Sequence, residues 1–394
     1  MSSRSVEEHA RAVRELLDRA WAPATEHIAV PDALGRVLDG DVHAPIDLPV
    51  FRNSQMDGFA VAAADVRDTP VTLTVASTVA AGDAGADRLA PGTAVKIMTG
   101  APIPEGADCI VPVEDTESQE GRVRILAPRR AGEFVRDRGS DVHAGDLLLA
   151  AGAHLTARHI AMFAAVGLVE VPVRRRPRVA VIATGAELVP AGTPLGPGQI
   201  HDSNSIALAA SVVANGGEVT FTGRSTDTPD EFRGMLREAG ADADVVITSG
   251  GVSMGEFEVV REVLTPLGGW FGHVAMQPGG PQGLTAVDGI PVLSFPGNPV
   301  STLVSFEVFA RAALRGSAGL PAAPTDRSTL TVPVTSPAGK RQFLRGRRVP
   351  GGVTLEAGPG SHLVAALARA DVLIDIPEDV TTMQAGDDVR VWVL

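Results

Sequence analysis

The feature that most constrains the fold is a strict alternation of apolar strands and amphipathic helices between residues 179 and 312. Short apolar runs are typical of buried parallel strands, and the segments between them space their apolar residues along one helical face. We expect strands at 179–183, 219–223, 244–247 and 291–295, and helices at 206–214, 229–239, 258–267 and 299–312. This pattern predicts a three-layer α/β domain with a mostly parallel sheet.

One strand of this domain runs into a helix through the small residues Thr248-Ser249-Gly250-Gly251-Val252-Ser253. Glycines let an anion approach the backbone N–H groups, and the positive end of a helix dipole attracts negative charge. The hydroxyl groups of Ser249 and Ser253 add possible hydrogen-bond donors. The pattern fits a phosphate-binding loop, but a tight turn without a ligand would have the same sequence, so both interpretations stay open at this point.

Two further stiff loops lie in the same domain. Pro296-Gly297-Asn298-Pro299 follows a strand and leads into a helix that carries Ser301, and Gln277-Pro278-Gly279-Gly280-Pro281 lies between the other two loops in sequence. Ligands of parallel α/β sheets bind beyond the carboxyl ends of the strands. We therefore expect Thr184-Gly185, Thr248 to Gly255 and Phe295 to Pro299 to meet at this edge of the sheet.

Carboxylates also gather in the turns of this domain, at Glu187, Asp202, Asp227, Glu256 and Glu258. Mg²⁺ beside a phosphate is commonly held by one or two carboxylates together with phosphate oxygens. Asp202 and Asp227 precede helix starts, so helix capping explains either of them equally well. Glu187 has no visible capping role, which favours a functional one.

Outside the α/β domain the texture changes. Ser5 and Glu8 fit a capping box that opens a first helix, and Thr156 is expected to cap a second. Between them, residues 51–141 alternate short β segments with Gly/Pro turns; if the second helix packs on the first, this β domain is an insertion. The chain after residue 319 returns to β texture and predicts a small barrel. The expected domains are residues 1–50 with 142–173, 51–141, 174–319 and 320–394.

Composition narrows the class of protein. A formal net charge of -13 argues against a surface for nucleic acid or anionic membranes. Cys109 is the only cysteine, so a disulfide framework and a cysteine-based zinc site are excluded. We see neither a signal peptide nor an apolar run of the roughly 18 residues that a membrane helix needs. We expect a cytoplasmic protein.

Several long motifs together resemble the MoeA family, the molybdopterin molybdenumtransferases, and the related E domain of gephyrin. The motifs are Asn53-Ser54-Gln55-Met56-Asp57-Gly58-Phe59-Ala60-Val61, Met98-Thr99-Gly100-Ala101-Pro102-Ile103-Pro104, Ala183-Thr184-Gly185-Ala186-Glu187-Leu188 and the loops at 248–255 and 295–301. The similarity is collinear from about Ser5 to Leu394. It implies a four-domain homodimer whose cleft lies between the α/β domain of one subunit and the inserted β domain of the other. The implied reaction uses adenylylated molybdopterin, molybdate and Mg²⁺, releases AMP, and leaves the metal on the dithiolene.

The resemblance also implies roles for particular residues. Asp57 and Thr99 match polar residues that face the cleft of the other subunit, and Asp141 matches a further family aspartate. Glu187, Asp227 and Glu258 match the acidic set for Mg²⁺ and the adenylate phosphates. The pterin and phosphate loops correspond to Ser249, Gly250, Gly251, Ser253, Pro278, Gly279, Pro281, Pro296, Gly297, Asn298 and Ser301. In the last domain Arg345 and Ser361 resemble residues near the proposed molybdate site.

The sequence departs from the family in three places. Gln277 and Gly280 stand where the family usually has the two lysines of a Lys-Pro-Gly-Lys-Pro loop, and each lost point charge weakens anion binding. Glu258 replaces the usual Asp, and Asp371 replaces the usual Asn. These departures motivate an alternative function, a gephyrin-like dimeric scaffold that binds a protein partner with weak or lost catalysis. A pterin carrier without turnover is a third possibility.

Overall fold

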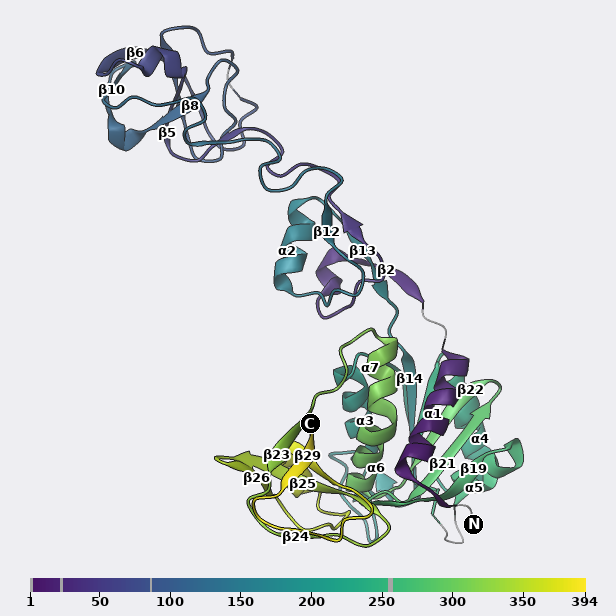
Figure 1. Cartoon of the computed structure of the whole chain (residues 1–394). Helices are drawn as coiled ribbons and strands as arrows, with labels where there is room; N and C mark the ends of the chain where they lie inside the picture. The colour runs from purple at the N-terminus through teal and green to yellow at the C-terminus, as the bar shows by residue number, and fades with distance from the viewer. Residues whose placement is uncertain (1–2, 22–23, 86, 254–257) are drawn as a thin grey trace. The chain divides into compact units, whose positions relative to one another are not determined.

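The structure is a computed structural model that describes residues 3–21, 24–85, 87–253 and 258–394 (Figure 1). The chain forms two compact units. The first combines Met1–Glu26 with Pro172–Leu394, and the second is His27–Val171. Each unit is described by itself below, and the predicted division into four domains stays a prediction.

The first unit is built on a seven-stranded sheet in the order β1, β19, β21, β22, β18, β14, β17. Strand β14 pairs in parallel with β17 and β18, and β18 pairs in parallel with β22, whereas β21 is antiparallel to both of its neighbours. The strands span Ser3–Arg4 (β1), Trp270–Val274 (β19), Pro281–Val287 (β21), Ile290–Phe295 (β22), Val245–Ser249 (β18), Arg178–Thr184 (β14) and Glu218–Ser225 (β17). The expected mostly parallel sheet is confirmed.

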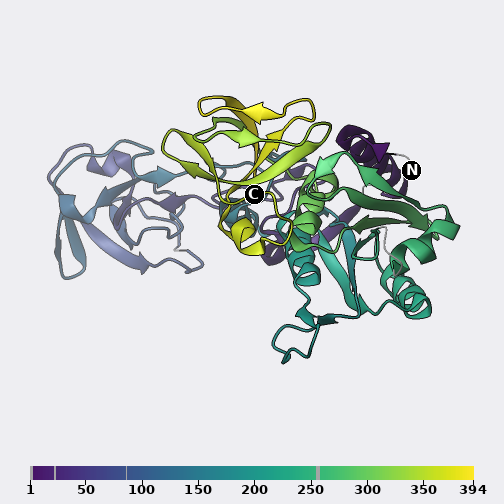
Figure 2. The ribbon, with the colours of Figure 1, turned by 90° about the horizontal axis from the view of Figure 1, so that it is seen from below.

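Helices cover both faces of this sheet and bury separate cores (Figure 2). One face carries α1 (Val6–Ala20), α3 (Asn204–Ala214), α6 (Pro299–Ser305) and α7 (Arg311–Ser317). The other face carries α4 (Pro229–Gly240) and α5 (Val259–Leu264). The predicted three-layer arrangement is therefore confirmed, because the apolar stripe of each helix faces the sheet.

The first helix begins as the sequence predicts but packs elsewhere. Ser5 and Glu8 form both hydrogen bonds of the capping box at its start. Its apolar stripe, with Val13 and Leu17 fully buried, joins the core of the α/β sheet. The helix from Thr156, α2 (Ala157–Ala165), belongs to the second unit. The sequence grouped the two helices in one linker domain, and the contacts instead group α1 with the sheet.

Three helix boundaries differ from expectation. Helix α5 ends at Leu264 and continues as a 3₁₀ turn, Thr265–Leu267, so its dipole is short. The long helix expected at 299–312 contains a π-helical segment, Phe306–Ala310, between α6 and α7. At the start of α4 the sequence Thr228-Pro229-Asp230-Glu231 fits a capping box, but Thr228 makes no side-chain cap there, and the carboxylate of Glu231 accepts hydrogen bonds from Thr226.

The C-terminal part of the first unit is a small β domain. Its main sheet runs β20 (Met276–Gln277), β25 (Arg341–Val349), β27 (Val372–Ile376), β29 (Asp388–Val393) and β23 (Thr325–Thr329). Strand β26 (Gly352–Leu355) pairs with β25, and a bridge between Leu330 and Val353 joins the opposite ends of this sheet. A short pair, β24 (Val334–Thr335) with β28 (Thr382–Met383), and helix α8 (Val364–Arg369) complete it. Such closure fits the predicted barrel.

The second unit has the expected β texture. Its main sheet runs β8 (Cys109–Pro112), β5 (Gly58–Val61), β7 (Thr93–Ile97), β6 (Val71–Val79), β10 (Arg122–Ile125) and β9 (Thr116–Gln119). Smaller ladders pair β11 (Val135–Arg136) with β4 (Asn53–Ser54) and β12 (Leu147–Leu149) with β3 (Val42–His43). Helix α2 packs on the 3₁₀ turn Val30–Ala33. In the described part of the chain no helix is long and apolar enough to span a membrane.

Candidate functional site

A cavity of about 460 Å³ opens at the carboxyl ends of β14, β18 and β22. All three predicted strand-end segments contribute to it, namely Thr184-Gly185, Ser249 to Ser253, and Pro296 to Asn298. Pro281, Pro299 and Ser301 also line it. This is the edge of a parallel sheet where ligands are expected to bind, so the predicted convergence of the loops is observed.

The glycine loop adopts a backbone that requires glycine. Gly250 and Gly251 have φ angles of 97° and 66°, in the left-handed region. A β-carbon on Gly250 would lie 2.5 Å from the carbonyl oxygen of Thr184, and one on Gly251 would lie 2.7 Å from Val260 Cγ2. The N–H of Gly250 donates to the carbonyl of Phe295 at 3.0 Å, which ties this loop to the neighbouring strand end.

A buried network of hydroxyl groups links the glycine loop to the proline loop. The Oγ of Ser249 and the Oγ1 of Thr302 lie 3.2 Å apart, and each hydroxyl can donate to the carbonyl of Pro296, at 3.3 and 2.6 Å. Asn204 joins from helix α3, with its Nδ2 2.9 Å from Ser249 Oγ and 2.7 Å from the carbonyl of Gly297. Ser249 and Thr302 are almost completely buried. The two loops are thus held by one continuous set of hydrogen bonds.

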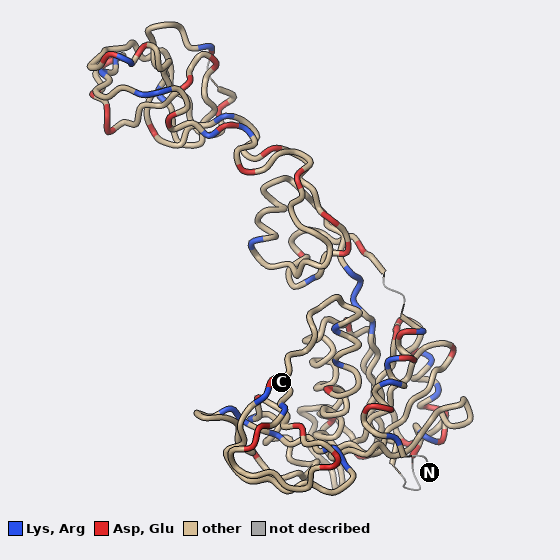
Figure 3. Tube along the Cα trace, viewed as in Figure 1, with Lys and Arg blue, Asp and Glu red and all other residues tan. Residues whose placement is uncertain are grey.

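The cavity wall is acidic. Glu187, Asp202, Asp227 and Glu258 all line it, and its lining contains no Lys or Arg among the residues that the structure describes. Acidic and basic residues alternate along the rest of both units (Figure 3). Asp227 accepts a hydrogen bond of 3.3 Å from the backbone N–H of Ala186. Glu256, proposed from the sequence as a further carboxylate, lies outside the described residues.

Asp202 has a structural task that the sequence left undecided. Its carboxylate accepts a 3.0 Å hydrogen bond from the backbone N–H of Ser205, in the first turn of α3, and a second bond from the Ser205 hydroxyl. It therefore caps the helix that carries Asn204. Across residues 3–21, 24–85, 87–253 and 258–394 no three His, Cys, Asp or Glu side chains gather closely enough to form a metal cage by themselves.

The loop from Gln277 to Pro281 contributes only its last residue to the cavity. Pro278 and Gly279 lie behind it, where the Nε2 of buried Gln282 donates to the Gly279 carbonyl and to Ser305 Oγ, both at 2.7 Å. Gln277 accepts a 2.7 Å hydrogen bond from Gln342 of the C-terminal β domain. At this junction neutral amide side chains hold the loop.

Arg345, proposed for molybdate, is fully buried in strand β25. Its Nη2 donates to the carbonyls of Gly358 and Gly360, but Nε and Nη1 have no hydrogen-bond partner among the residues that the structure describes. A buried guanidinium without a counter-ion is costly unless an anion binds it. The backbone of Ser361 accepts a 3.1 Å hydrogen bond from Val300 at the start of α6, so this pair lies next to the proline loop but outside the cavity lining.

The remaining predicted site residues lie in the second unit. Asp57 Oδ1 accepts hydrogen bonds from the backbone N–H and the hydroxyl of Thr99, at 2.6 and 2.8 Å. These two bonds, the backbone one first, lower the pKa of the Asp57 carboxyl below its ordinary value. Asp141 is exposed, and its backbone N–H donates to Leu48. Asp57 and Thr99 thus form a contact pair that the sequence motifs did not by themselves reveal.

Sequence reasoning missed Asn204 and Thr302. The signal for Asn204 is the polar run Asp202-Ser203-Asn204 before an apolar helix, which is equally typical of a helix start. Thr302 follows Ser301 on α6. To predict which way its side chain points, the exact start of this seven-residue helix would have to be known. Neither residue type carries a motif, so only the packed structure identifies them.

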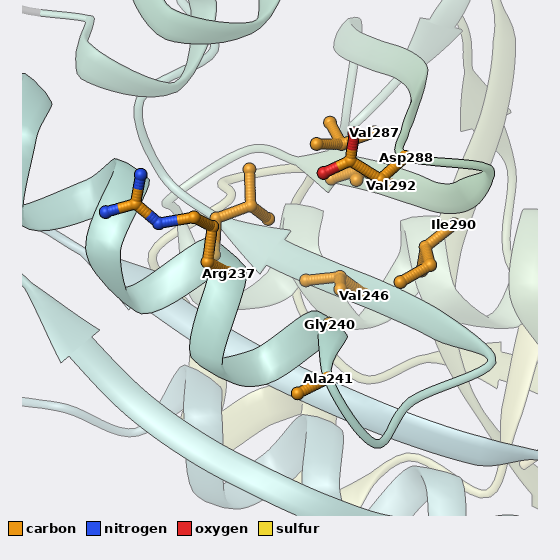
Figure 4. A pocket seen from close by; sticks show the side chains of 9 residues that line it. Arg237, Gly240, Ala241, Val246, Val287, Asp288, Ile290 and Val292 are labelled. Carbon is orange, nitrogen blue, oxygen red and sulfur yellow. The ribbon is translucent and has the colours of Figure 1, made fainter.

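A second cavity, of about 210 Å³, lies far from the loops just described (Figure 4). It is formed by the end of α4, the start of β18 and the β21–β22 hairpin, at the amino ends of β18 and β22. Its lining is mostly apolar, with Arg237 and Asp288 as its charged members. It shares no residue with the acidic cavity.

The three-layer arrangement and the glycine and proline loops around an acid-lined cavity define a multi-domain α/β protein with a candidate site at the carboxyl ends of its parallel strands. Residues 4–167 match the MoeA N-terminal region (domain I and II), residues 180–316 match a probable molybdopterin binding domain, and residues 327–394 match the MoeA C-terminal region (domain IV). The chain belongs to the MoeA family. This confirms the resemblance seen in the sequence.

Relatives and solved structures agree with this assignment. The chain is 47% identical over 406 residues to molybdopterin molybdenumtransferase 2 of Mycobacterium tuberculosis, covering 99% of this chain and 100% of that protein. It is 32% identical over 402 residues to the molybdopterin molybdenumtransferase of Bacillus subtilis, covering 97% and 93%. Two crystal structures of the molybdopterin biosynthesis MoeA protein from Pyrococcus horikoshii match with TM-scores of 0.82 and 0.72 at 32% and 27% identity, covering 100% of this chain and 99% and 100% of theirs.

Proposed function

We propose that this chain is a molybdopterin molybdenumtransferase that inserts molybdate into adenylylated molybdopterin and releases AMP. The observation that carries the proposal is the meeting of the Ser249–Ser253 loop, the Pro296–Ser301 loop and the carboxylates Glu187 and Asp227 around one cavity. Loops of this kind bind the phosphates of a nucleotide, and acids beside them suit metal-assisted phosphate chemistry. The names of the full-length relatives support the same reaction.

Within this proposal each part of the cavity has a task. The left-handed backbone at Gly250 and Gly251, where no side chain projects, lets the pyrophosphate approach the main chain closely. Ser253 and Asn298 line the same wall and supply side-chain hydrogen bonds to the pterin phosphate. Asp227 and Glu187 orient the water or metal that acts on the anhydride. These roles rest on position in the cavity and on the family resemblance.

The carboxylates of the cavity would suit a Mg²⁺ ion that is held jointly by the protein and the substrate phosphates. Asp227, Glu187 and Glu258 line the cavity, while the described residues supply no three-residue cage. An ion that keeps several waters and binds one or two carboxylates plus substrate phosphates matches such a wall. When bound, it would neutralise the negative charge that develops on the phosphate oxygens. Glu258 would bind this ion through a side chain that is one methylene longer than that of the aspartate usual in the family.

For molybdate we propose Arg345 with Ser361. The unpaired Nε and Nη1 of a fully buried arginine suit a dianion, because charge-assisted hydrogen bonds would offset the cost of burial. The hydrogen bond from Val300 to Ser361 keeps this pair beside α6. Since Gln277 and Gly280 carry no charge, Arg345 is the cation on which molybdate binding depends in this proposal.

We also propose that the chain acts as a homodimer, in which Asp57 and Thr99 of one subunit face the cavity of the other. The exposed face of α3 supports self-association, since Ile206 and Val213 are 58% and 59% exposed there. A mixing experiment tests it. Two inactive variants, Asp57→Ala and Asp227→Asn, should together regain about a quarter of wild-type activity if each site uses both subunits, from random pairing of subunits. A cytoplasmic location stays a prediction.

The central test is molybdate insertion by purified protein. Wild-type chain with Mg²⁺, molybdate and adenylylated molybdopterin should form active cofactor and release AMP in equal amounts. A folded dimer that gives no AMP at millimolar molybdate would contradict the proposal. A stoichiometric protein partner that Asp227→Asn still recovers would then favour the scaffold function.

A further inference from the structure

The side chain of Asn204 connects the two loops of the acidic cavity. Its Nδ2 group lies 2.7 Å from the carbonyl oxygen of Gly297 and 2.9 Å from Ser249 Oγ. Because a carbonyl oxygen can only accept, the amide must present its NH₂ group on this side, which settles its orientation. Both protons of that group are therefore used, one for each loop.

This connection reaches beyond the two atoms that Asn204 touches. Ser249 Oγ lies 3.2 Å from Thr302 Oγ1, and Thr302 donates to the carbonyl of Pro296 at 2.6 Å. Ser249 and Thr302 are 1% and 0% exposed, so water cannot replace these bonds. Asn204 lines the cavity, as Ser249 does, and comes from a third segment, at the start of helix α3.

Helix α3 holds Asn204 firmly at its first position. Asp202 caps the helix through Ser205, and Leu208 and Val212 bury its inner face in the core. A short amide on a fixed helix end is a rigid spacer, because its rotamer is set by two hydrogen bonds and its backbone by the cap. The spacing of the glycine loop and the proline loop thus rests on this side chain together with the direct hydrogen bonds from Gly250 to Phe295 and from Ser249 to Pro296.

We propose that Asn204 is a positioning residue of this site, which sets the spacing of the two loops that hold the phosphates of the adenylylated pterin. The inference rests on the proposed function, and it adds a residue on which substrate binding depends. Molybdate, held at Arg345 in the C-terminal β domain, is not in contact with this network. Loss of Asn204 therefore weakens the nucleotide end of the site and spares the molybdate end.

The test compares variants at the two ends of the same helix. Asn204→Ala removes both bonds, and Asn204→Asp keeps the size but cannot donate to Gly297. Asn215→Ala is the matched control, because Asn215 ends α3, donates to Ser211 and accepts from Arg311 and Arg315 away from the cavity. AMP binding is measured by calorimetry with Mg²⁺, KM for both substrates by turnover, and folding by thermal melting.

We expect Asn204→Ala to raise the Kd of AMP and the KM of adenylylated molybdopterin roughly ten- to a hundredfold, the effect of two hydrogen bonds. The KM of molybdate should stay within about twofold of the wild-type value, because Arg345 is not part of this network. A twofold change corresponds to only a few tenths of a kcal/mol. Asn204→Asp should show at least as large a loss, because its carboxylate faces the Gly297 carbonyl and adds negative charge beside the phosphates. Asn215→Ala should lower the melting temperature and leave AMP binding unchanged.

The outcomes separate this inference from the proposed function. If wild type binds AMP more tightly than Asn204→Ala but forms no cofactor, the positioning role stands and the proposed reaction fails. If wild type forms cofactor and Asn204→Ala binds AMP equally well, the positioning role is wrong. Equal losses in Asn204→Ala and Asn215→Ala, or a wild-type chain that binds no AMP, also overturn it.

Discussion

The Nδ1 atom of His273 lies 3.1 Å from the point that a β-carbon on Gly280 would occupy. His273 also faces Pro281 across the antiparallel β19–β21 pair, and Pro281 lines the acidic cavity. A lysine at position 280 would therefore share its space with the imidazole. The sequence alone predicts that Gly280→Lys improves molybdate affinity, and the structure adds a neighbour that must move first.

We expect Gly280→Lys alone to give little gain, and Gly280→Lys with His273→Ala to lower the KM of molybdate about tenfold or more, the worth of one charge-assisted hydrogen bond. His273→Ala alone is the control for the lost imidazole. Molybdate KM values of the three variants and wild type provide the measurement. A single Gly280→Lys variant as good as the double variant would show that His273 does not compete for the space.

Asp227→Asn should reduce turnover more than binding. The carboxylate lines the cavity and accepts a long hydrogen bond from Ala186, a contact too weak for the fold to depend on it. Charge beside a reacting phosphate acts mainly in the transition state, so we expect kcat to fall about tenfold or more while KM changes little. Steady-state kinetics at several Mg²⁺ concentrations would measure it. A rise in KM at unchanged kcat would place Asp227 in ground-state binding instead.

Thr99→Val should raise the pKa of Asp57 without restoring its ordinary value. The variant removes the hydroxyl bond at 2.8 Å and leaves the backbone bond at 2.6 Å, which is the larger cause of the lowered pKa. A carboxyl with a lowered pKa in the folded state stabilises the fold above its unfolded pKa, and this is lost as pH falls through the folded pKa. The stability that wild type gains from this bond should thus be present at neutral pH and be lost in acid. The difference in free energy of unfolding between wild type and Thr99→Val should therefore disappear at low pH.

Carbon-detected NMR titration of the Asp57 carboxyl measures the shift. Thr116→Val is the control, because its hydroxyl donates to the carbonyl of Val113 in the same unit. An unchanged Asp57 pKa in Thr99→Val would show that the hydroxyl bond has no electrostatic effect on the carboxyl.

Much of this fold could be predicted from local sequence patterns. The predictions that failed concern contacts between segments distant in sequence. Strand and helix positions from 178 to 305 depend on apolar spacing, which is local, and the loops converge because parallel strands end at one edge. The packing of α1 on the sheet depends on a partner surface over 200 residues away, which no local pattern contains. At Asp202 the same side chain suits a cap and a metal, so only its bonds to Ser205 decide.

The residues of the candidate site likewise divide into those that the sequence could predict and those that it could not. Gly250 and Gly251 were identifiable because glycine is needed where φ is positive. Asn204 was not, because its role lies in two loops that are distant in sequence and meet only after folding. At Gln277, where the family usually has a lysine, the side-chain amide accepts a hydrogen bond from the amide of Gln342, a contact that the sequence did not suggest.

Arg345→Met should separate stability from molybdate binding. The buried guanidinium leaves Nε and Nη1 unpaired, so an apolar side chain of similar length is expected to leave the free energy of unfolding unchanged or raise it. Molybdate affinity should fall about ten- to a hundredfold, as for a lost charge-assisted bond. Urea unfolding and the KM of molybdate test both halves. Parallel losses of stability and affinity would indicate that Arg345 serves the fold alone.

His9 should make the first unit sensitive to mild acid. It is 1% exposed between the rings of Trp270 and Phe309, with centroids at 5.1 and 4.7 Å, and Arg4 Nη1 lies 3.4 Å from its Nδ1. Burial first, and then the charge of Arg4, lower the pKa of His9 from 6.5 to about 3. The folded state therefore cannot bind the proton that the unfolded state takes up below pH 6.5.

The free energy of unfolding should then fall by up to about 1.4 kcal/mol for each pH unit between 6.5 and about 3. Phenylalanine keeps an aromatic ring in contact with Trp270 and Phe309 but cannot be protonated, so His9→Phe should lose this part of the pH dependence. Urea unfolding of wild type and His9→Phe from pH 4 to 8 measures the difference, and His154→Phe, at an exposed position, is the control. Identical pH slopes for wild type and His9→Phe would mean that His9 accepts its proton without unfolding.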